Sequence, residues 1–217
     1  MGPLLAALAL ALTLDADAAP LKIVALGDST TAGTPAFLSP LEAPPDGDGN
    51  PQSQFAYWMT KARPKWRVLN RGVNGERADS IRARFERDVA AEKPRVVIVL
   101  AGVNDAYQGR PTESTHIDLA WMYRRAKLLG IVPVAATVLP FTRATAAQSE
   151  RIERLNAWIR KRAAAEKIPL CDTAAAAADP KNPLALKGSP DGLHPDVAGY
   201  RAMAASLVKT IDALNLD

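Results

Sequence analysis

The sequence predicts an α/β protein built around a parallel β-sheet, and three observations point to this fold class. From residue 22 onward, short apolar segments alternate with longer segments of helical periodicity, the pattern of repeated βα units. The apolar segments are rich in β-branched residues and hardly alternate, as expected of strands covered on both faces. The chain has 217 residues, 48% of them apolar, which is enough for one good-sized core.

The expected elements follow one another in βα order. The strands are predicted at residues 23–26, 68–70, 96–101, 132–137 and 168–171, and the helices at residues 54–62, 80–90, 114–129, 149–167 and 195–214. Gly130 suits the position just after the third helix, and Pro195 suits the first turn of the last helix. Residues 33–53, rich in Pro, Gly and Asp, are too long for an ordinary βα loop. We expect this segment to be a flexible acidic loop, or a functional one that lines the substrate cleft.

The N-terminus predicts a secretory signal peptide. Residues 4–14 are uncharged and apolar, and Ala-Asp-Ala at residues 16–18 provides a cleavage pattern of the A-x-A type. Cleavage after residue 18 would leave a single domain at residues 19–217 and would make the protein secreted or periplasmic. The alternative is an uncleaved extension.

Composition excludes several classes of function. One cysteine cannot form a disulfide framework, and two histidines without a C-x-x-C or H-E-x-x-H pattern make a zinc site unexpected. A formal charge of +4 and 6% aromatic residues do not predict a nucleic-acid partner. The apolar N-terminal run of residues 4–14 is too short for stable insertion into a membrane.

Four short motifs follow strands or precede the last helix. They are Gly-Asp-Ser-Thr at residues 27–30, Gly-Val-Asn-Gly at 72–75, Gly-Val-Asn-Asp at 102–105 and Asp-Gly-Leu-His-Pro at 191–195. Ligands of open parallel sheets bind beyond the carboxyl ends of the strands. These motifs therefore predict one site at that edge of the sheet.

The first and last motifs contain the residue types of nucleophilic catalysis. Ser29, at a strand-to-helix turn, can expose its hydroxyl, although a serine there can also be a simple helix cap. His194 is the candidate base, because Pro195 restricts its backbone and Asp191 is close enough in the same turn to orient the imidazole. The other histidine, His116, lies in a capped helix start and is expected to be exposed and structural.

An acyl-transfer site also needs donors for the negatively charged oxygen of the tetrahedral intermediate. The backbone N–H of Ser29 at a helix start, the backbone N–H of Gly75 and the side-chain amide of Asn104 are the candidate oxyanion donors. Each has an ordinary alternative, as a turn glycine or a local cap. Their presence on separate strand-end loops, together with a nucleophile and a base, favours catalysis.

At these motifs the chain resembles the SGNH hydrolases, also called the GDSL esterase/lipase family. The resemblance implies a flavodoxin-like three-layer α/β/α sandwich with a five-stranded parallel sheet of order 2-1-3-4-5. It also implies hydrolysis of carboxylic esters without a metal or any cofactor. Carried over by motif position, Ser29 is the nucleophile, His194 the general base and Asp191 its orienting carboxylate. Ser29, Gly75 and Asn104 form the oxyanion hole.

The motifs also contain positions that are expected to be structural or that differ from the family pattern. Asp28 and Asp105 match the family but look structural. Thr30 departs from the leucine of the family name, and it follows the nucleophile, so the change is expected to affect packing and leave the chemistry alone. Gly75 is preferred over Gly72 as the glycine of the second motif.

These observations predict a secreted serine esterase that forms an acyl-enzyme on Ser29. The expected partner is a small-molecule or carbohydrate ester with a short acyl or O-acetyl group. Two alternatives stay open at this point. The first is a lysophospholipase or thioesterase of the same family, and the second is a noncatalytic carbohydrate-binding module on the same fold.

Overall fold

The computed structural model describes residues 19–216, so the predicted signal peptide lies outside the described residues. Its central sheet contains β1 (Leu21–Gly27), β4 (Trp66–Gly72), β5 (Val96–Leu100), β6 (Val132–Ala136) and β7 (Leu170–Cys171). The strand order is β4-β1-β5-β6-β7, and every neighbouring pair is parallel. In the order of these five strands along the chain this is 2-1-3-4-5, so the predicted fold class and topology are confirmed.

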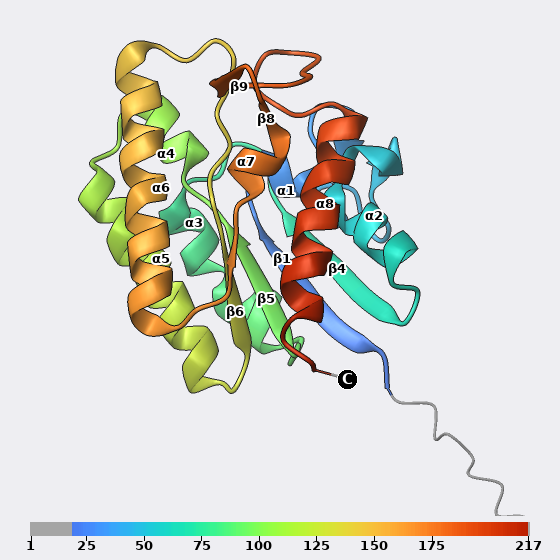
Figure 1. Ribbon diagram of the computed structural model, residues 1–217. Helices are drawn as coiled ribbons and strands as arrows, with labels where there is room; N and C mark the ends of the chain where they lie inside the picture. The colour runs from blue at the N-terminus through green and yellow to red at the C-terminus, as the bar shows by residue number, and fades with distance from the viewer. Residues whose placement is uncertain (1–18, 217) are drawn as a thin grey trace, which may run out of the picture.

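Helices cover both faces of the sheet (Figure 1). One face carries α3 (Ala78–Ala83), a π-helix η2 (Glu86–Ala90), α4 (Val103–Gln108), α5 (Thr112–Leu128) and α6 (Ala146–Glu166). The other face carries α2 (Phe55–Ala62), α7 (Thr173–Ala177) and α8 (Val197–Asp212). Short elements fill the connections, namely α1 (Ser29–Ala32), β2 (Phe37–Leu38), β3 (Asp48–Gly49), η1 (Pro51–Ser53), β8 (Ala178–Asp179) and β9 (Asn182–Leu186). Within residues 19–216, no helix combines the length and the apolar character that crossing a bilayer requires.

The core consists of two apolar clusters, one on each side of the sheet. Val24 and Leu26 of β1 belong to the cluster that includes residues of α3, α5 and α6, whereas Ile23 and Ala25 belong to the cluster that includes residues of α2 and α8. All four side chains are fully buried. Because successive side chains of a strand point to opposite faces, one apolar strand supplies both clusters. This is why the buried strands show almost no alternation in the sequence.

Several predicted element boundaries differ in the structure, and three of these differences have an evident local cause. The helix expected at 80–90 is interrupted at Arg84, with α3 ending before it and the π-helix η2 beginning after it. The last strand is shorter than expected, because Ile168 donates its N–H to the Ala163 carbonyl at the end of α6 and Pro169 has no N–H. The last helix begins after Pro195, because the side chain of Asp196 caps it.

The long segment at residues 33–53 is ordered, so the expected flexible loop was wrong. Strands β2 and β3 pair within it as a small antiparallel ladder, and η1 follows directly. Ser39 in this segment is fully buried and donates its hydroxyl to the Gly72 carbonyl at 2.6 Å. The segment is therefore fastened to the end of β4 next to the predicted second motif.

Tyr123 of α5 allows a test of the core. Its side chain is fully buried, and its hydroxyl has no hydrogen-bond partner among residues 19–216. An unpaired buried hydroxyl loses its bonds to water without replacement, so we expect Tyr123→Phe to raise the free energy of unfolding by about 1 kcal/mol in urea denaturation.

Tyr200 of α8 provides the matched control, because it is equally buried but donates its hydroxyl to the Thr34 carbonyl at 3.3 Å. Tyr200→Phe should therefore lower the free energy of unfolding. A larger loss for Tyr123→Phe than for Tyr200→Phe would contradict this account of the core.

Candidate active site

Two segments that are distant in the sequence meet at the carboxyl edge of the sheet. Ser29 follows β1 as the first residue of α1, and His194 lies in the loop before α8. The distance between Ser29 Oγ and His194 Nε2 is 2.9 Å, across 165 positions of the chain. Ser29 is 3% exposed and His194 is 5% exposed, so the contact is shielded from bulk water.

The imidazole of His194 is held from its other side by Asp191. The distance from His194 Nδ1 to Asp191 Oδ2 is 2.7 Å. An ionised carboxylate can only accept hydrogen bonds, so Nδ1 must donate the proton and Nε2 of the neutral ring is left as an acceptor. The hydroxyl of Ser29 then donates to Nε2, which is the direction that a general base requires.

The carboxylate of Asp191 is fixed by its own turn. The N–H groups of Leu193 and His194 both donate to Asp191 Oδ1, at 2.9 and 2.8 Å. Partial burial acts to raise the pKa of Asp191, but the hydrogen bonds from the His194 ring and from these two backbone groups outweigh it and lower the pKa to about 2. Asp191 is therefore ionised at neutral pH and can hold the ring in one tautomer.

Ser189 stabilises the same loop, and sequence reasoning missed it. Its hydroxyl donates to the His194 carbonyl at 2.6 Å and accepts the Gly192 N–H at 2.8 Å. A serine two residues before an aspartate in a turn is a recognisable local pattern, so the signal was present. The Thr142 N–H, from the loop after β6, donates to the Gly192 carbonyl at 2.8 Å and ties the turn to the sheet.

The two predicted backbone donors, the N–H groups of Ser29 and Gly75, each have a local geometry that suits this role. As the first residue of α1, Ser29 has an N–H with no acceptor inside the helix. Gly75 has a φ of +77°, which favours glycine, and a Cβ built on it would meet nothing within 4 Å. A Cβ on Gly72 would lie 2.1 Å from the Ala32 backbone nitrogen. Gly72 is therefore a packing glycine, whereas Gly75 borders open space.

Asn104 lies at the start of α4 and is half-buried. Its Nδ2 donates to the Glu76 carbonyl at 2.8 Å. A primary amide has two N–H groups, so this bond fixes the orientation of the side chain and leaves the second N–H as the candidate oxyanion donor. The partner, Glu76, directly follows Gly75, so two of the candidate donors are coupled through one residue.

Asp28 and Asp105 have structural contacts, as expected. Asp28 caps α1 by accepting the Thr30 N–H at 3.0 Å. Burial raises the pKa of Asp28 to about 7, opposed by the Thr30 hydrogen bond and assisted by the nearby charge of Asp105. Asp105 accepts from the Ala78 N–H, the Thr115 hydroxyl and the Arg110 guanidinium at 2.8 to 3.0 Å. It thereby joins α3, α4 and α5 below the site.

The ordered segment at residues 33–53 supports the loop that carries Gly75. Glu42 accepts the Asn74 N–H at 2.8 Å through Oε1 and the Ser39 N–H at 2.9 Å through Oε2. One side chain therefore connects the segment to the residue just before Gly75. The acidic composition of residues 33–53 suggested a solvated loop, but the Glu42 carboxylate accepts hydrogen bonds from two backbone N–H groups.

His116 lies on α5 and takes no part in these contacts. Its ring stacks on Trp158 of α6 at a centroid distance of 4.3 Å, and burial lowers its pKa. The expected structural role agrees with this position, but the expected exposure was wrong, because the ring packs between two helices.

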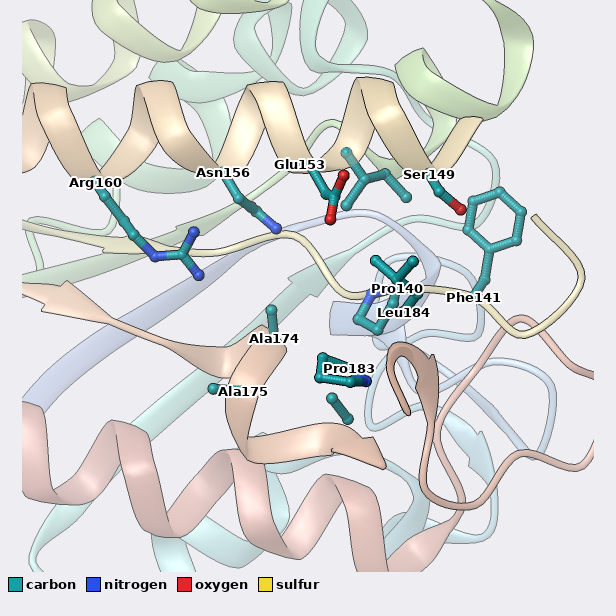
Figure 2. Close-up of a pocket in the computed structure, with 12 residues that line it drawn as sticks. Pro140, Phe141, Ser149, Glu153, Asn156, Arg160, Ala174, Ala175, Pro183 and Leu184 are labelled. Atoms are coloured by element: carbon teal, nitrogen blue, oxygen red, sulfur yellow. The ribbon is translucent and has the colours of Figure 1, made fainter. Parts of the chain in front are cut away.

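A cavity of about 320 Å³ lies next to the loop after β6. Figure 2 shows Pro140 and Phe141 of this loop, the α6 side chains Ser149, Glu153, Asn156 and Arg160, and the opposing residues of α7 and β9. Phe141 also makes an edge contact with Tyr107 of α4 at 5.8 Å between ring centroids. None of Ser29, Asp191 and His194 lines this cavity, so it is separate from the candidate active site.

A parallel α/β/α sandwich that joins a serine, a histidine and an aspartate by hydrogen bonds at the carboxyl edge of its sheet has the residue set of hydrolases that transfer an acyl group through a serine. The comparison with protein families makes this assignment specific. The chain belongs to the GDSL-like lipase/acylhydrolase family, whose model matches residues 25–202.

Solved structures and curated proteins include several similar chains. A putative lipolytic protein of the G-D-S-L family from Desulfitobacterium hafniense is 28% identical, with a TM-score of 0.73 over 88% of this chain and 99% of that one. The acetylxylan esterase Axe2 from Geobacillus stearothermophilus is 21% identical, with a TM-score of 0.69 over 88% and 93%. The uncharacterized lipoprotein YqeF of Bacillus subtilis is 27% identical over 128 residues, which is 54% of this chain and 48% of that protein. The match thus spans about half the length of this curated relative.

Proposed function

We propose that this protein is a serine esterase that hydrolyses carboxylic esters of short acyl groups through an acyl-enzyme on Ser29. The observation that carries the proposal is a continuous series of two hydrogen bonds. Ser29 Oγ lies 2.9 Å from His194 Nε2, and His194 Nδ1 lies 2.7 Å from Asp191 Oδ2. These three side chains are of the types that such a reaction needs as nucleophile, base and orienting carboxylate.

In the proposed acylation step, Ser29 Oγ attacks the carbonyl carbon of the ester while His194 Nε2 takes the hydroxyl proton. Negative charge then develops on the carbonyl oxygen, where the N–H groups of Ser29 and Gly75 and the amide of Asn104 stabilise it. When the bond to the alcohol breaks, His194 returns the proton to the departing alcohol oxygen. Water then attacks the acyl-enzyme while the same imidazole takes its proton. The bond to Ser29 Oγ breaks, His194 returns that proton to Oγ, and the carboxylic acid is released.

The preference for short acyl groups rests on two observations. Little of Ser29 and His194 is exposed, at 3% and 5%, which favours a small substituent at the carbonyl. A structure of the same fold, Axe2, is described as an acetylxylan esterase, and a second match to an acetylxylan esterase is 40% identical over 42 residues. An O-acetyl group on a carbohydrate is therefore the first substrate to test. The predicted signal peptide and the match to a lipoprotein support a location outside the cytoplasm.

A panel of model esters tests this proposal. Purified protein is assayed on p-nitrophenyl esters from acetyl to palmitoyl, on acetylated xylo-oligosaccharides, on a lysophospholipid and on an acyl thioester, with Ser29→Ala as the blank. We expect kcat/KM to be highest for acetyl and propionyl esters. A maximum at long acyl chains, the lysophospholipid or the thioester would replace the short-chain assignment. No hydrolysis above the blank would favour a binding module.

A further inference from the structure

Arg84, at the break between α3 and η2, is a buried guanidinium with four hydrogen bonds. Its side chain is only 7% exposed. Nε donates to Glu76 Oε2 at 2.7 Å, Nη1 donates to Asp88 Oδ2 at 2.7 Å and to the Arg71 carbonyl at 2.9 Å, and Nη2 donates to the Gly27 carbonyl at 2.8 Å. Arg84 thus joins the carboxyl ends of the two neighbouring strands β1 and β4.

The acceptors of Arg84 lie next to the candidate oxyanion donors. Gly27 is two residues before Ser29, and Glu76 directly follows Gly75. The carbonyl of Glu76 also accepts the amide of Asn104. Arg84 is therefore linked to Ser29 through the Gly27 carbonyl, two residues before the serine. It is linked to Gly75 and Asn104 through Glu76, which follows Gly75 and accepts the Asn104 amide.

The local backbone also indicates that the position of Arg84 is specific. A regular helix through residues 80–90 would satisfy its backbone hydrogen bonds, yet helix α3 ends at Ala83 and a π-helix begins at Glu86. Irregular helical turns of this kind occur frequently at functional sites. Burying a guanidinium costs desolvation free energy, which good geometry and several partners must offset.

We propose that Arg84 and Glu76 are positioning residues that set the geometry of the oxyanion hole. This inference rests on the proposed function. Arg84 holds the carboxylate of Glu76, and the backbone of Glu76 then fixes the Gly75 N–H on one side and the Asn104 amide on the other. Neither side chain touches the substrate in this account. Their effect is on turnover, because oxyanion donors bind the transition state more strongly than the ground state.

The test compares Glu76→Ala with Glu92→Ala. Glu76 and Glu92 are similar carboxylates, 22% and 27% exposed, and each lies 2.7 Å from an arginine. Within residues 19–216, the carboxylate of Glu92 pairs with the side chains of Arg71 and Lys22 and makes no hydrogen bond to Ser29, Gly75 or Asn104. Active sites are counted by the burst of a slowly deacylating ester, and kcat is expressed per active site. This normalisation removes any loss that results only from unfolded protein.

We expect Glu76→Ala to lower kcat per active site by about tenfold to a hundredfold with KM changed by less than about threefold, the signature of lost transition-state binding. Glu92→Ala should stay within about twofold of the wild type, within the range of a surface change. Glu76→Gln keeps an oxygen that can accept from Arg84 Nε, so it should recover most of the lost turnover.

A double-mutant cycle with Asn104→Ala separates positioning from general destabilisation. Asn104→Ala alone should lower kcat by about a hundredfold or more, as for loss of one oxyanion donor. If Glu76 acts partly through this donor, Glu76→Ala should cost clearly less in the Asn104→Ala background than in the wild type. Equal losses for Glu76→Ala and Glu92→Ala, or full additivity in the cycle, would overturn the inference and leave the proposed esterase intact. Unchanged hydrolysis by Ser29→Ala, measured in the same series, would instead overturn the proposed function.

Discussion

Ser29→Ala is expected to lower kcat by about ten-thousandfold or more and to abolish covalent labelling by a fluorophosphonate. The reagent reacts only with an activated hydroxyl, and the Ser29 hydroxyl lies 2.9 Å from an imidazole whose tautomer Asp191 determines. Mass spectrometry of the intact protein measures the labelling, because one adduct raises the mass by a known amount.

Ser80→Ala is the matched control for this experiment. Ser80 is an exposed serine on α3, so its replacement removes a hydroxyl without touching the candidate site. It should label at the wild-type rate. If Ser29→Ala labels as fast as Ser80→Ala, Ser29 is not the nucleophile.

His194→Ala is expected to have a similarly large effect, a loss of about ten-thousandfold in kcat, because the base for both half-reactions is removed. In the wild type, activity should fall toward acidic pH, since a protonated ring cannot accept the Ser29 proton. The residual activity of His194→Ala should lack this acid limb. Initial rates of ester hydrolysis between about pH 4.5 and 9 measure both effects.

The pKa of Asp191 allows the acid limb to be assigned to the imidazole. With a pKa of about 2 in the folded protein, below the ordinary aspartate value of 3.8, Asp191 stays ionised over the whole assayed range. A carboxyl with a lowered pKa stabilises the fold above its unfolded pKa and loses this contribution as the pH falls toward the folded value. The loss of stability from Asp191 is therefore expected only below about pH 4, after the activity has gone.

The matched control is His116→Gln, which removes the other histidine of the chain. His116 stacks on Trp158 between two helices and has no contact with Ser29 or Asp191. Its replacement should preserve both the activity and the acid limb. If the acid limb disappears in His116→Gln and persists in His194→Ala, His194 is not the general base and our assignment is wrong.

The candidate site shows what the sequence allowed to be predicted. Ser29, Asn104 and Asp191 could be found because each directly follows a recognisable strand or lies in a turn with glycine and proline. Arg84 and Glu76 could not be found in this way. Their positions in the sequence are ordinary for a solvated helix and a polar turn. The contacts that tie them to the site, from Arg84 to the Gly27 carbonyl and from Asn104 to the Glu76 carbonyl, span 57 and 28 residues.

The segment at residues 33–53 shows the same limit in a loop. Its Pro, Gly and Asp content is typical of a flexible connection, yet its buried Ser39 and its Glu42 bind the backbone around β4. Composition reports the local tendency of a segment to avoid regular structure. Whether such a segment is held in place depends on acceptors and donors from other parts of the chain.

The sequence by itself determined the order of strands and helices, and with it the edge of the sheet at which the polar motifs would gather. Local periodicity and turn residues contain this information, because neighbours along the chain decide both. Only the tertiary structure decided that the Ser29 hydroxyl and the His194 imidazole would come within 2.9 Å and that a buried arginine would join β1 to β4. These contacts link residues that are distant in the sequence, and their geometry exists only once the sheet has formed and its helices have packed.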